Sequence, residues 1–263
     1  MGKKLFNSFK IAFSMYSKIP MPNSEWTEEN MSYAMCFFPM IGGVIGLILW
    51  GAYQLSLYAG KVGISLSGMF WTILYVLIPL LVTGGIHMDG FLDTKDALSS
   101  YQPKERRLEI LKDPHAGAFA IISCGIYLLS YVGIYSSLTE RSVPVIALSF
   151  MISRAFSGLS VVTFPQARKS GEGTVATFSE NALDKVTRVV LILYLLLIGG
   201  VMIVIGKLLG VAALVTAFCV YRYYHHMTIE KFGGITGDLA GYFLQLCEIL
   251  MALTVVLGDA VLK

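Results

Sequence analysis

The sequence predicts an all-α protein: a polytopic integral membrane bundle of about seven transmembrane helices, preceded by an amphipathic helix in the membrane interface. Hydrophobic residues make up 56% of the 263 residues and charged residues only 14%, against roughly 25% in an ordinary soluble domain. Apolar runs of bilayer-spanning length recur along the chain. Basic residues gather in alternate connecting segments. The composition excludes a disordered chain, and a net charge of +3 gives no reason to expect a nucleic-acid partner.

The first segment has the pattern of a helix that lies in the membrane interface. Lysines fall mostly on other faces than the apolar stripe, as in helices that bury one side among lipid head groups. Two prolines then end the helix, because proline lacks the backbone N–H that a helix needs. The stripe and the prolines are Leu5, Phe9, Phe13, Tyr16, Pro20 and Pro22.

Seven apolar segments follow as candidate spans. Three of them contain a charged residue: Arg154 in the fourth, Arg222 in the sixth and Glu248 in the seventh. A charge inside a span is costly, so each indicates either a functional site or an internal ion pair, such as Arg154 or Arg222 with Glu248. The segments are residues 36–58, 62–86, 118–138, 142–163, 189–206, 208–226 and 240–258, the sixth being the weakest.

Positive charge orients these spans. Basic residues are frequent before the first span and after the second and fourth, and rare in the opposite loops. The positive-inside rule places the basic segments in the cytoplasm and the C-terminus on the far side. We therefore expect one domain over residues 1–263, in the cell membrane, with its active site facing the cytoplasm.

The strongest chemical signal begins where the second apolar run ends. Asp89, Asp93 and Asp96 are spaced i, i+4, i+7, which places them within roughly 60° of one another on a helix. Three carboxylates on one stripe repel each other unless a cation lies among them. Mg²⁺ suits such a site, because it binds one or two carboxylates together with water and phosphate oxygens. We expect these aspartates to be catalytic and to bind Mg²⁺; a solvated helix with salt bridges is the alternative.

Neighbouring residues extend the candidate site. His87 either accepts a proton from an incoming hydroxyl or makes a structural hydrogen bond. Glu109 and Asp113 are again four residues apart, with basic residues beside them and His115 in the turn that follows. Carboxylates for a metal and basic groups for phosphate are what phosphoryl transfer needs. We take Glu109, Asp113 and His115 as substrate-binding candidates, with ordinary surface salt bridges as the alternative.

Further polar residues lie on the predicted cytoplasmic side or just inside it. Arg168 lies in a glycine-rich turn that suits an anion. Asp238 and Gln245 are seven residues apart, on one helical face. With Arg154, we take these as substrate-binding candidates that converge on one site.

These motifs resemble those of the cobalamin synthase family, the adenosylcobinamide-GDP ribazoletransferases. The resemblance covers nearly the whole chain, in order. One departure is the sequence KDPH at residues 112–115, where the family pattern leads us to expect Lys-Asp-Ser-Arg. The matching blocks are FSMYSKIPMP, FFPMIGGVIG, GGIHMDGFLDTKDA, RRLEILKDPHAG, the turn at Arg168 and GITGDLAGYFLQLCE.

The resemblance implies a Mg²⁺-dependent membrane enzyme of cobalamin assembly. Such an enzyme transfers the cobinamide phosphate of adenosylcobinamide-GDP to α-ribazole, or its 5′-phosphate, and releases GMP. It implies Asp89, Asp93 and Asp96 as ligands of Mg²⁺ and diphosphate, with Asp238 as a further carboxylate. Beyond the substrates and the bilayer, we expect a second copy of the chain or another cobalamin-assembly enzyme as partner.

Two other functions compete with this interpretation. A CDP-alcohol phosphotransferase also uses aspartates at the end of a span, but its motif continues Asp-Gly with Ala-Arg, whereas Phe91 and Leu92 follow Gly90 here. A transporter would use the charged residues inside the spans to line a path. No inverted repeat is evident in the sequence, which disfavours transport.

Overall fold

The computed structural model describes residues 2–167 and 184–262, and these form helices joined by short connections. Six of the described helices are long and apolar enough to cross a membrane, and a bent pair, α4 with α5, makes a seventh if it is counted as one span. The predicted all-α membrane fold with its N-terminal helix is confirmed. The six are α3 (Ala34–Lys61), α7 (Ala118–Tyr135), α8 (Ser142–Val161), α10 (Asp184–Gly206), α11 (Leu208–Phe232) and α12 (Gly237–Val261).

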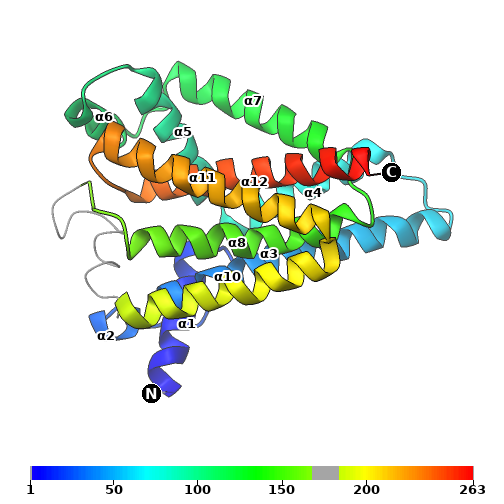
Figure 1. Cartoon of the computed structure of the whole chain (residues 1–263), viewed down its shortest axis with the longest axis horizontal. Helices are drawn as coiled ribbons and strands as arrows, with labels where there is room; N and C mark the ends of the chain where they lie inside the picture. Colours follow the sequence, from blue (N-terminus) through cyan, green and yellow to red (C-terminus); the bar gives the residue numbers. More distant parts are fainter. Residues whose placement is uncertain (1, 168–183, 263) are drawn as a thin grey trace.

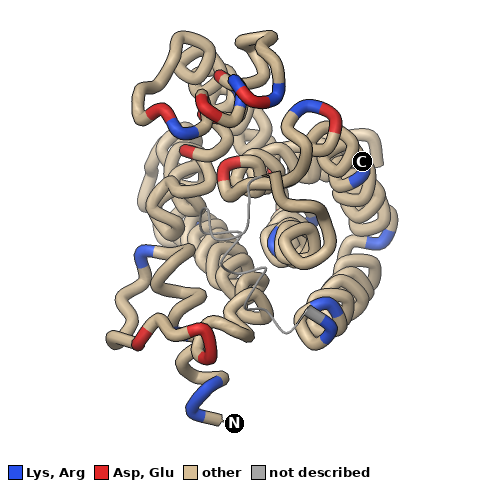
Figure 2. The backbone as a smooth tube through the Cα atoms, turned by 90° about the vertical axis from the view of Figure 1, so that its left-hand side faces the viewer, with Lys and Arg blue, Asp and Glu red and all other residues tan. Residues whose placement is uncertain are grey.

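The long helices run alongside one another, and the chain's polar segments gather at one end of them. In Figure 1, α5 (Ile86–Ser99) and α6 (Lys104–Ile110) lie at the left end, and the C-terminus lies at the right. α1 (Gly2–Tyr16) crosses the bundle near the left end, next to α2 (Glu28–Met31). Figure 2 looks at this left end and shows acidic and basic residues in the segments that connect the spans. A candidate site built from these residues therefore lies at one end of the bundle.

The predicted second span, residues 62–86, is wrong at both ends. The Ser67 hydroxyl accepts a hydrogen bond from the Phe70 N–H at 3.1 Å and starts α4 (Gly68–Thr83), so residues 62–66 precede the helix. Gly84 and Gly85 have φ of 66° and 81°, a left-handed conformation that favours glycine. They end α4 and turn the chain by 94° into α5. The hydropathy of the sequence does not predict this turn, because the uncharged run continues through both glycines to Ile86.

The predicted sixth span also has a different end. α11 continues as one helix to Phe232, beyond residue 226, and Gly233 ends it in the left-handed conformation. Arg222 is exposed on its surface.

α8 packs against α3 with the two backbones very close together. A Cβ atom at Gly42 would lie 2.1 Å from the Phe150 carbonyl oxygen, and one at Gly46 would lie 2.2 Å from the Ala147 carbonyl oxygen. Glycines four residues apart on one helix face allow this approach, as in many membrane helix pairs. The contact fixes the position of α8, which carries Arg154.

We predict that Gly42→Ala destabilises the protein by about 1–3 kcal/mol, because its methyl group must push α3 away from α8. Gly51→Ala is the matched control on the same helix, since a Cβ there meets no atom within 4 Å. Thermal unfolding of both variants in detergent measures the difference. Equal melting temperatures would show that α3 and α8 do not pack as described.

Candidate active site

The candidate site forms where α5 crosses α12 at backbone contact. A Cβ atom at Gly90 would lie 2.7 Å from the Asp238 carbonyl oxygen. One at Gly241 would lie 2.8 Å from the His87 carbonyl oxygen. Glycine at both positions therefore lets the first turn of α5 lie against the first turn of α12. This crossing brings Asp89 and Asp238, 149 positions apart in the sequence, to one place.

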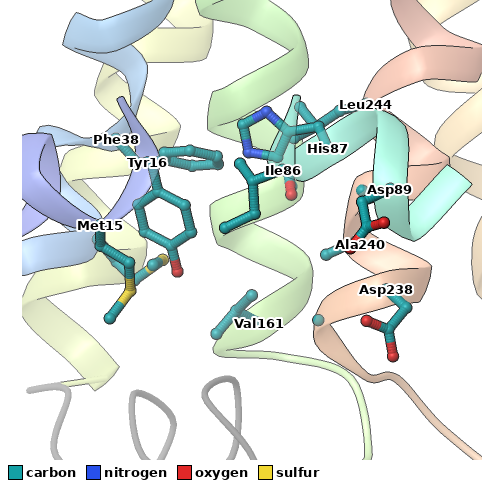
Figure 3. A pocket seen from close by; sticks show the side chains of 14 residues that line it. Met15, Tyr16, Phe38, Ile86, His87, Asp89, Val161, Asp238, Ala240 and Leu244 are labelled. Atoms are coloured by element: carbon teal, nitrogen blue, oxygen red, sulfur yellow. The ribbon is translucent and has the colours of Figure 1, made fainter. Parts of the chain in front are cut away.

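A pocket of about 230 Å³ opens at this crossing. Asp89 and Asp238 line one end of it, and Tyr16, Phe38 and His87 line the other (Figure 3). Pockets that enclose a drug-sized ligand measure about 300–1,000 Å³. This one therefore has room for a small part of a large substrate, and the remainder must lie outside it.

Two helix N-termini point into the acidic end of the pocket. Asp89 lies in the first turn of α5 and Asp238 in the first turn of α12. Thr236 caps α12, its hydroxyl accepting a hydrogen bond from the Leu239 N–H at 3.3 Å. Free backbone N–H groups and the helix dipole make such ends favourable for anions, phosphate groups included.

The carboxylates at this end interact with one another. α5 turns away from α4 and carries four charged residues, so we place it outside the membrane spans. The pKa of Asp93 is raised to about 6, first by partial burial and then, in order of effect, by the charges of Asp89, Asp238 and Asp96. The negative charge predicted from the sequence is thus concentrated here, and a bound cation would reduce the repulsion among these carboxylates.

The residues fit a metal that a substrate helps to hold, rather than a closed protein cage. Within the described ranges, no group of three or more His, Cys, Asp or Glu side chains is arranged to hold an ion alone. Mg²⁺ does not need such a group, because it takes one or two carboxylates and completes its shell with water and phosphate oxygens. Asp89 and Asp238 supply suitable oxygens in the first turns of the two helices, and Asp93 lies one turn further along α5.

Asp96, the third aspartate of the stripe, contacts the start of α7. Its carboxylate accepts hydrogen bonds from the backbone N–H groups of Gly117 and of Ala120, the latter at 2.9 Å. These belong to the start of α7, so Asp96 caps that helix from 21 residues away. The i, i+4, i+7 spacing correctly predicts one helix, and the carboxylate of Asp96 also caps a second helix. The predicted binding of Mg²⁺ by the three aspartates stays a prediction.

The candidates after α5 lie away from the pocket. Glu109 forms an exposed ion pair with Arg106. The Asp113 carboxylate accepts hydrogen bonds from the backbone N–H and the ring of His115, which lower its pKa, and the His115 side chain is 89% exposed. Lys104 and Arg107 donate to backbone carbonyls near the end of α11, both at 3.3 Å. The surface salt-bridge alternative describes Glu109, Asp113 and His115 better than a phosphate site does.

Arg154 and Glu248 form the buried ion pair that the sequence left open as an alternative. Arg154 Nη1 lies 2.6 Å from Glu248 Oε1, and both side chains are at most 3% exposed. The Ser153 hydroxyl donates to the same carboxylate oxygen at 2.9 Å. Because Glu248 pairs with its charge inside the bundle, Arg154 does not present a free cation to the pocket.

The remaining predicted residues have mixed outcomes. The Gln245 side-chain oxygen accepts a hydrogen bond from the Tyr127 hydroxyl in the bundle interior. Arg168 lies outside the described residues. The chain just before it is held beside α12, since the Ala167 N–H donates to the Ile235 carbonyl at 3.0 Å.

Sequence reasoning missed the aromatic end of the pocket. Tyr16 reaches it because the Lys18 N–H donates to the Val82 carbonyl at 2.8 Å, which ties the chain after α1 to the end of α4. Phe38 comes from the first turns of α3. The only available signal was that both residues lie in the family blocks FSMYSKIPMP and FFPMIGGVIG, since aromatic residues in apolar segments otherwise indicate packing.

The fold and this site define a polytopic helical membrane protein with an acidic pocket, bordered by two helix N-termini, at one end of its bundle. A family model described as cobalamin-5-phosphate synthase, CobS, matches residues 8–256. The chain therefore belongs to the cobalamin-5-phosphate synthase family.

Several curated relatives match nearly the whole chain, each described as adenosylcobinamide-GDP ribazoletransferase. One from Lachnoclostridium phytofermentans is 48% identical over 259 residues, which cover 98% of this chain and 97% of the relative. One from Clostridium botulinum is 33% identical and covers 94% of this chain and 96% of the relative. One from Treponema denticola is 33% identical and covers 92% and 94%. No solved structure gives a significant match.

We predict that Asp96→Asn lowers thermal stability, because an amide oxygen cannot replace both hydrogen bonds of the helix cap, a loss of about 1 kcal/mol. Asp93→Asn is the matched control on the same helix and should not destabilise, since it removes repulsion among carboxylates. Melting in detergent without divalent cations measures both. An equal loss in the two variants would contradict the helix cap by Asp96.

Removal of Arg154 alone should cost about 3–5 kcal/mol, because Glu248 would be left as a buried unpaired charge. The double variant Arg154→Leu/Glu248→Leu should recover most of that loss. A double-mutant cycle on thermal unfolding tests this. If the two single losses simply add, the pair is not the source of the stability.

Proposed function

We propose that this chain is a Mg²⁺-dependent adenosylcobinamide-GDP ribazoletransferase, the activity for which its relatives are named. The observation that carries the proposal is the meeting of Asp89 and Asp238 at two helix N-termini, beside a pocket too small for the whole substrate. Such an arrangement suits a reaction at a diphosphate whose large corrin ring stays outside.

The reaction is a displacement at phosphorus. A ribose hydroxyl oxygen of α-ribazole, or of its 5′-phosphate, forms a bond to the phosphorus that carries cobinamide. The bond from that phosphorus to the bridging oxygen of the diphosphate breaks, GMP leaves with this oxygen, and the hydroxyl releases its proton. Negative charge accumulates on the phosphate oxygens during the transfer, so a site must supply compensating positive charge.

The residues of the pocket have distinct tasks in this scheme. Asp89, Asp93 and Asp238 would hold Mg²⁺, which neutralises the diphosphate oxygens when it is bound. The N-terminal N–H groups of α5 and α12 orient the diphosphate. The close contact at Gly90 and Gly241 keeps these groups in a fixed relation. Binding and orientation by rigid elements lower the entropic cost of the transfer.

We infer that the site faces the cytoplasm. Basic residues of the connecting segments lie at the same end of the bundle as α5, whose first turn lines the pocket. The positive-inside rule places such basic segments in the cytoplasm. The cell membrane as location, a single domain over residues 1–263, and association with a second copy or with another cobalamin-assembly enzyme stay predictions.

Release of GMP by the purified protein in liposomes tests the proposal. The assay contains adenosylcobinamide-GDP and α-ribazole, with and without Mg²⁺. We expect release only when all three are present. If the folded protein instead releases CMP from a CDP-alcohol and an alcohol acceptor, the phospholipid-synthase alternative replaces this proposal.

Asp89→Asn and Asp93→Asn should each lower turnover at least ~100-fold while the protein still inserts, because charge that holds the metal at the reacting phosphate is lost. Glu105→Gln is the control, an equivalent change on exposed α6. Turnover is compared at limiting Mg²⁺. Turnover similar to that of Glu105→Gln would remove these aspartates from the metal site.

A further inference from the structure

We infer that the aromatic end of the pocket binds the base of ribazole, and that His87 donates a hydrogen bond to the ring nitrogen of that base that carries no ribose. The inference rests on the proposed function and names the part of the substrate that this pocket takes.

His87 is a buried polar side chain without a partner. It is 5% exposed, and neither Nδ1 nor Nε2 has a hydrogen-bond partner among the described residues. A buried polar atom left unpaired costs free energy, so such groups are rare in stable proteins. His87 also lines the pocket, at its aromatic end. At least one ring nitrogen carries a hydrogen in either protonation state, so the side chain can always donate.

The ring neighbours of His87 are aromatic, and the Arg154 guanidinium lies 5.9 Å from one of them, Phe38. The His87 ring stacks on Tyr16 with 6.1 Å between ring centroids and 16° between planes, and the Phe38 ring lies 5.8 Å away. Met35, Val161 and Leu244 line other parts of the pocket. Aromatic and apolar walls of this kind favour a flat ring system with few polar edges.

The size and lining of the pocket distinguish among the three large groups in the reaction, which are the corrin ring, guanine and the base of ribazole. The corrin ring is too large for about 230 Å³. Guanine carries several donors and acceptors on its edge, and a pocket whose only polar side chains apart from the two carboxylates are Tyr16, His87 and Ser157 would leave some of them unpaired. Ribazole is a riboside of a benzimidazole, which has an apolar edge and one free ring nitrogen that accepts a hydrogen bond. One acceptor on the base matches His87, the one pocket-lining side chain whose buried polar atoms have no hydrogen-bond partner among the described residues.

A base at the aromatic end of the pocket is also well placed for the phosphate transfer proposed at the acidic end. His87 and Asp89 lie in the same turn of α5, and Figure 3 shows the aromatic side chains on one side of the pocket and the two carboxylates on the other. A base held at the aromatic side therefore directs its ribose toward the carboxylates. His87 would act by positioning the acceptor for the transfer.

The test compares two acceptors that differ at one ring atom: the α-ribosides of benzimidazole and of indole, which has C–H in place of the free nitrogen. We expect wild-type protein to bind the indole compound about tenfold more weakly, the value of one hydrogen bond. Calorimetric titration of each riboside into the protein, without adenosylcobinamide-GDP, measures this directly. His87→Phe keeps an aromatic ring but has no donor, and it should bind both compounds equally.

The outcomes separate this inference from the proposed function. If wild-type protein binds the two ribosides equally, His87 makes no hydrogen bond to the base and the inference is wrong, although GMP release can still establish the transferase. If His87→Phe keeps the tenfold preference, another group recognises the nitrogen and the inference is equally wrong. In turnover assays, the KM for ribazole should rise in His87→Phe while the KM for adenosylcobinamide-GDP stays unchanged. Val161→Phe, which narrows the pocket beside the base, should weaken both ribosides alike.

Discussion

The backbone contact between α5 and α12 is the constraint on which the site depends. Gly90 and Gly241 let two helices touch without side chains between them, and this places the first turn of each beside the other. The left-handed glycines 84 and 85 supply the 94° turn that aims α5 at this contact. Without either feature, Asp89 and Asp238 would lie far apart, and the pocket that both line would not form.

Charged residues have different surroundings inside the bundle and at the end that carries the pocket. Among the described residues inside the bundle, Arg154 pairs with Glu248, and Asp259 at the far end accepts a hydrogen bond from the Thr139 hydroxyl at 2.7 Å. At the end that carries the pocket, carboxylates instead gather near one another, and the helix N-termini beside them attract anions. A site that alternates acidic side chains with positive helix ends suits a ligand that contains both a metal ion and phosphates.

Individual residues show how far sequence reasoning reached. The spacing of the three aspartates predicts their shared helix, because helical periodicity is local. It does not predict that Asp96 caps α7, because the start of α7 is brought there by the chain's path through α6. Arg154 and Glu248 each suggested a functional site or an ion pair, and only their 2.6 Å separation decided for the pair. The segment that contains Glu109, Asp113 and His115 combines acidic and basic residues, as a site for phosphoryl transfer does. In the structure, Glu109 pairs with Arg106, and Asp113 pairs with His115.

The sequence by itself determined the membrane class, the approximate spans, the acidic motif and the family, because hydropathy, charge asymmetry and motif spacing are properties of the linear chain. Only the tertiary structure decided which carboxylates share a pocket, where the second apolar run bends, and that Tyr16 and Phe38 meet His87. These features depend on contacts between segments far apart in the chain. The free energy of such contacts comes from packing and from backbone geometry, which no local pattern of residues encodes.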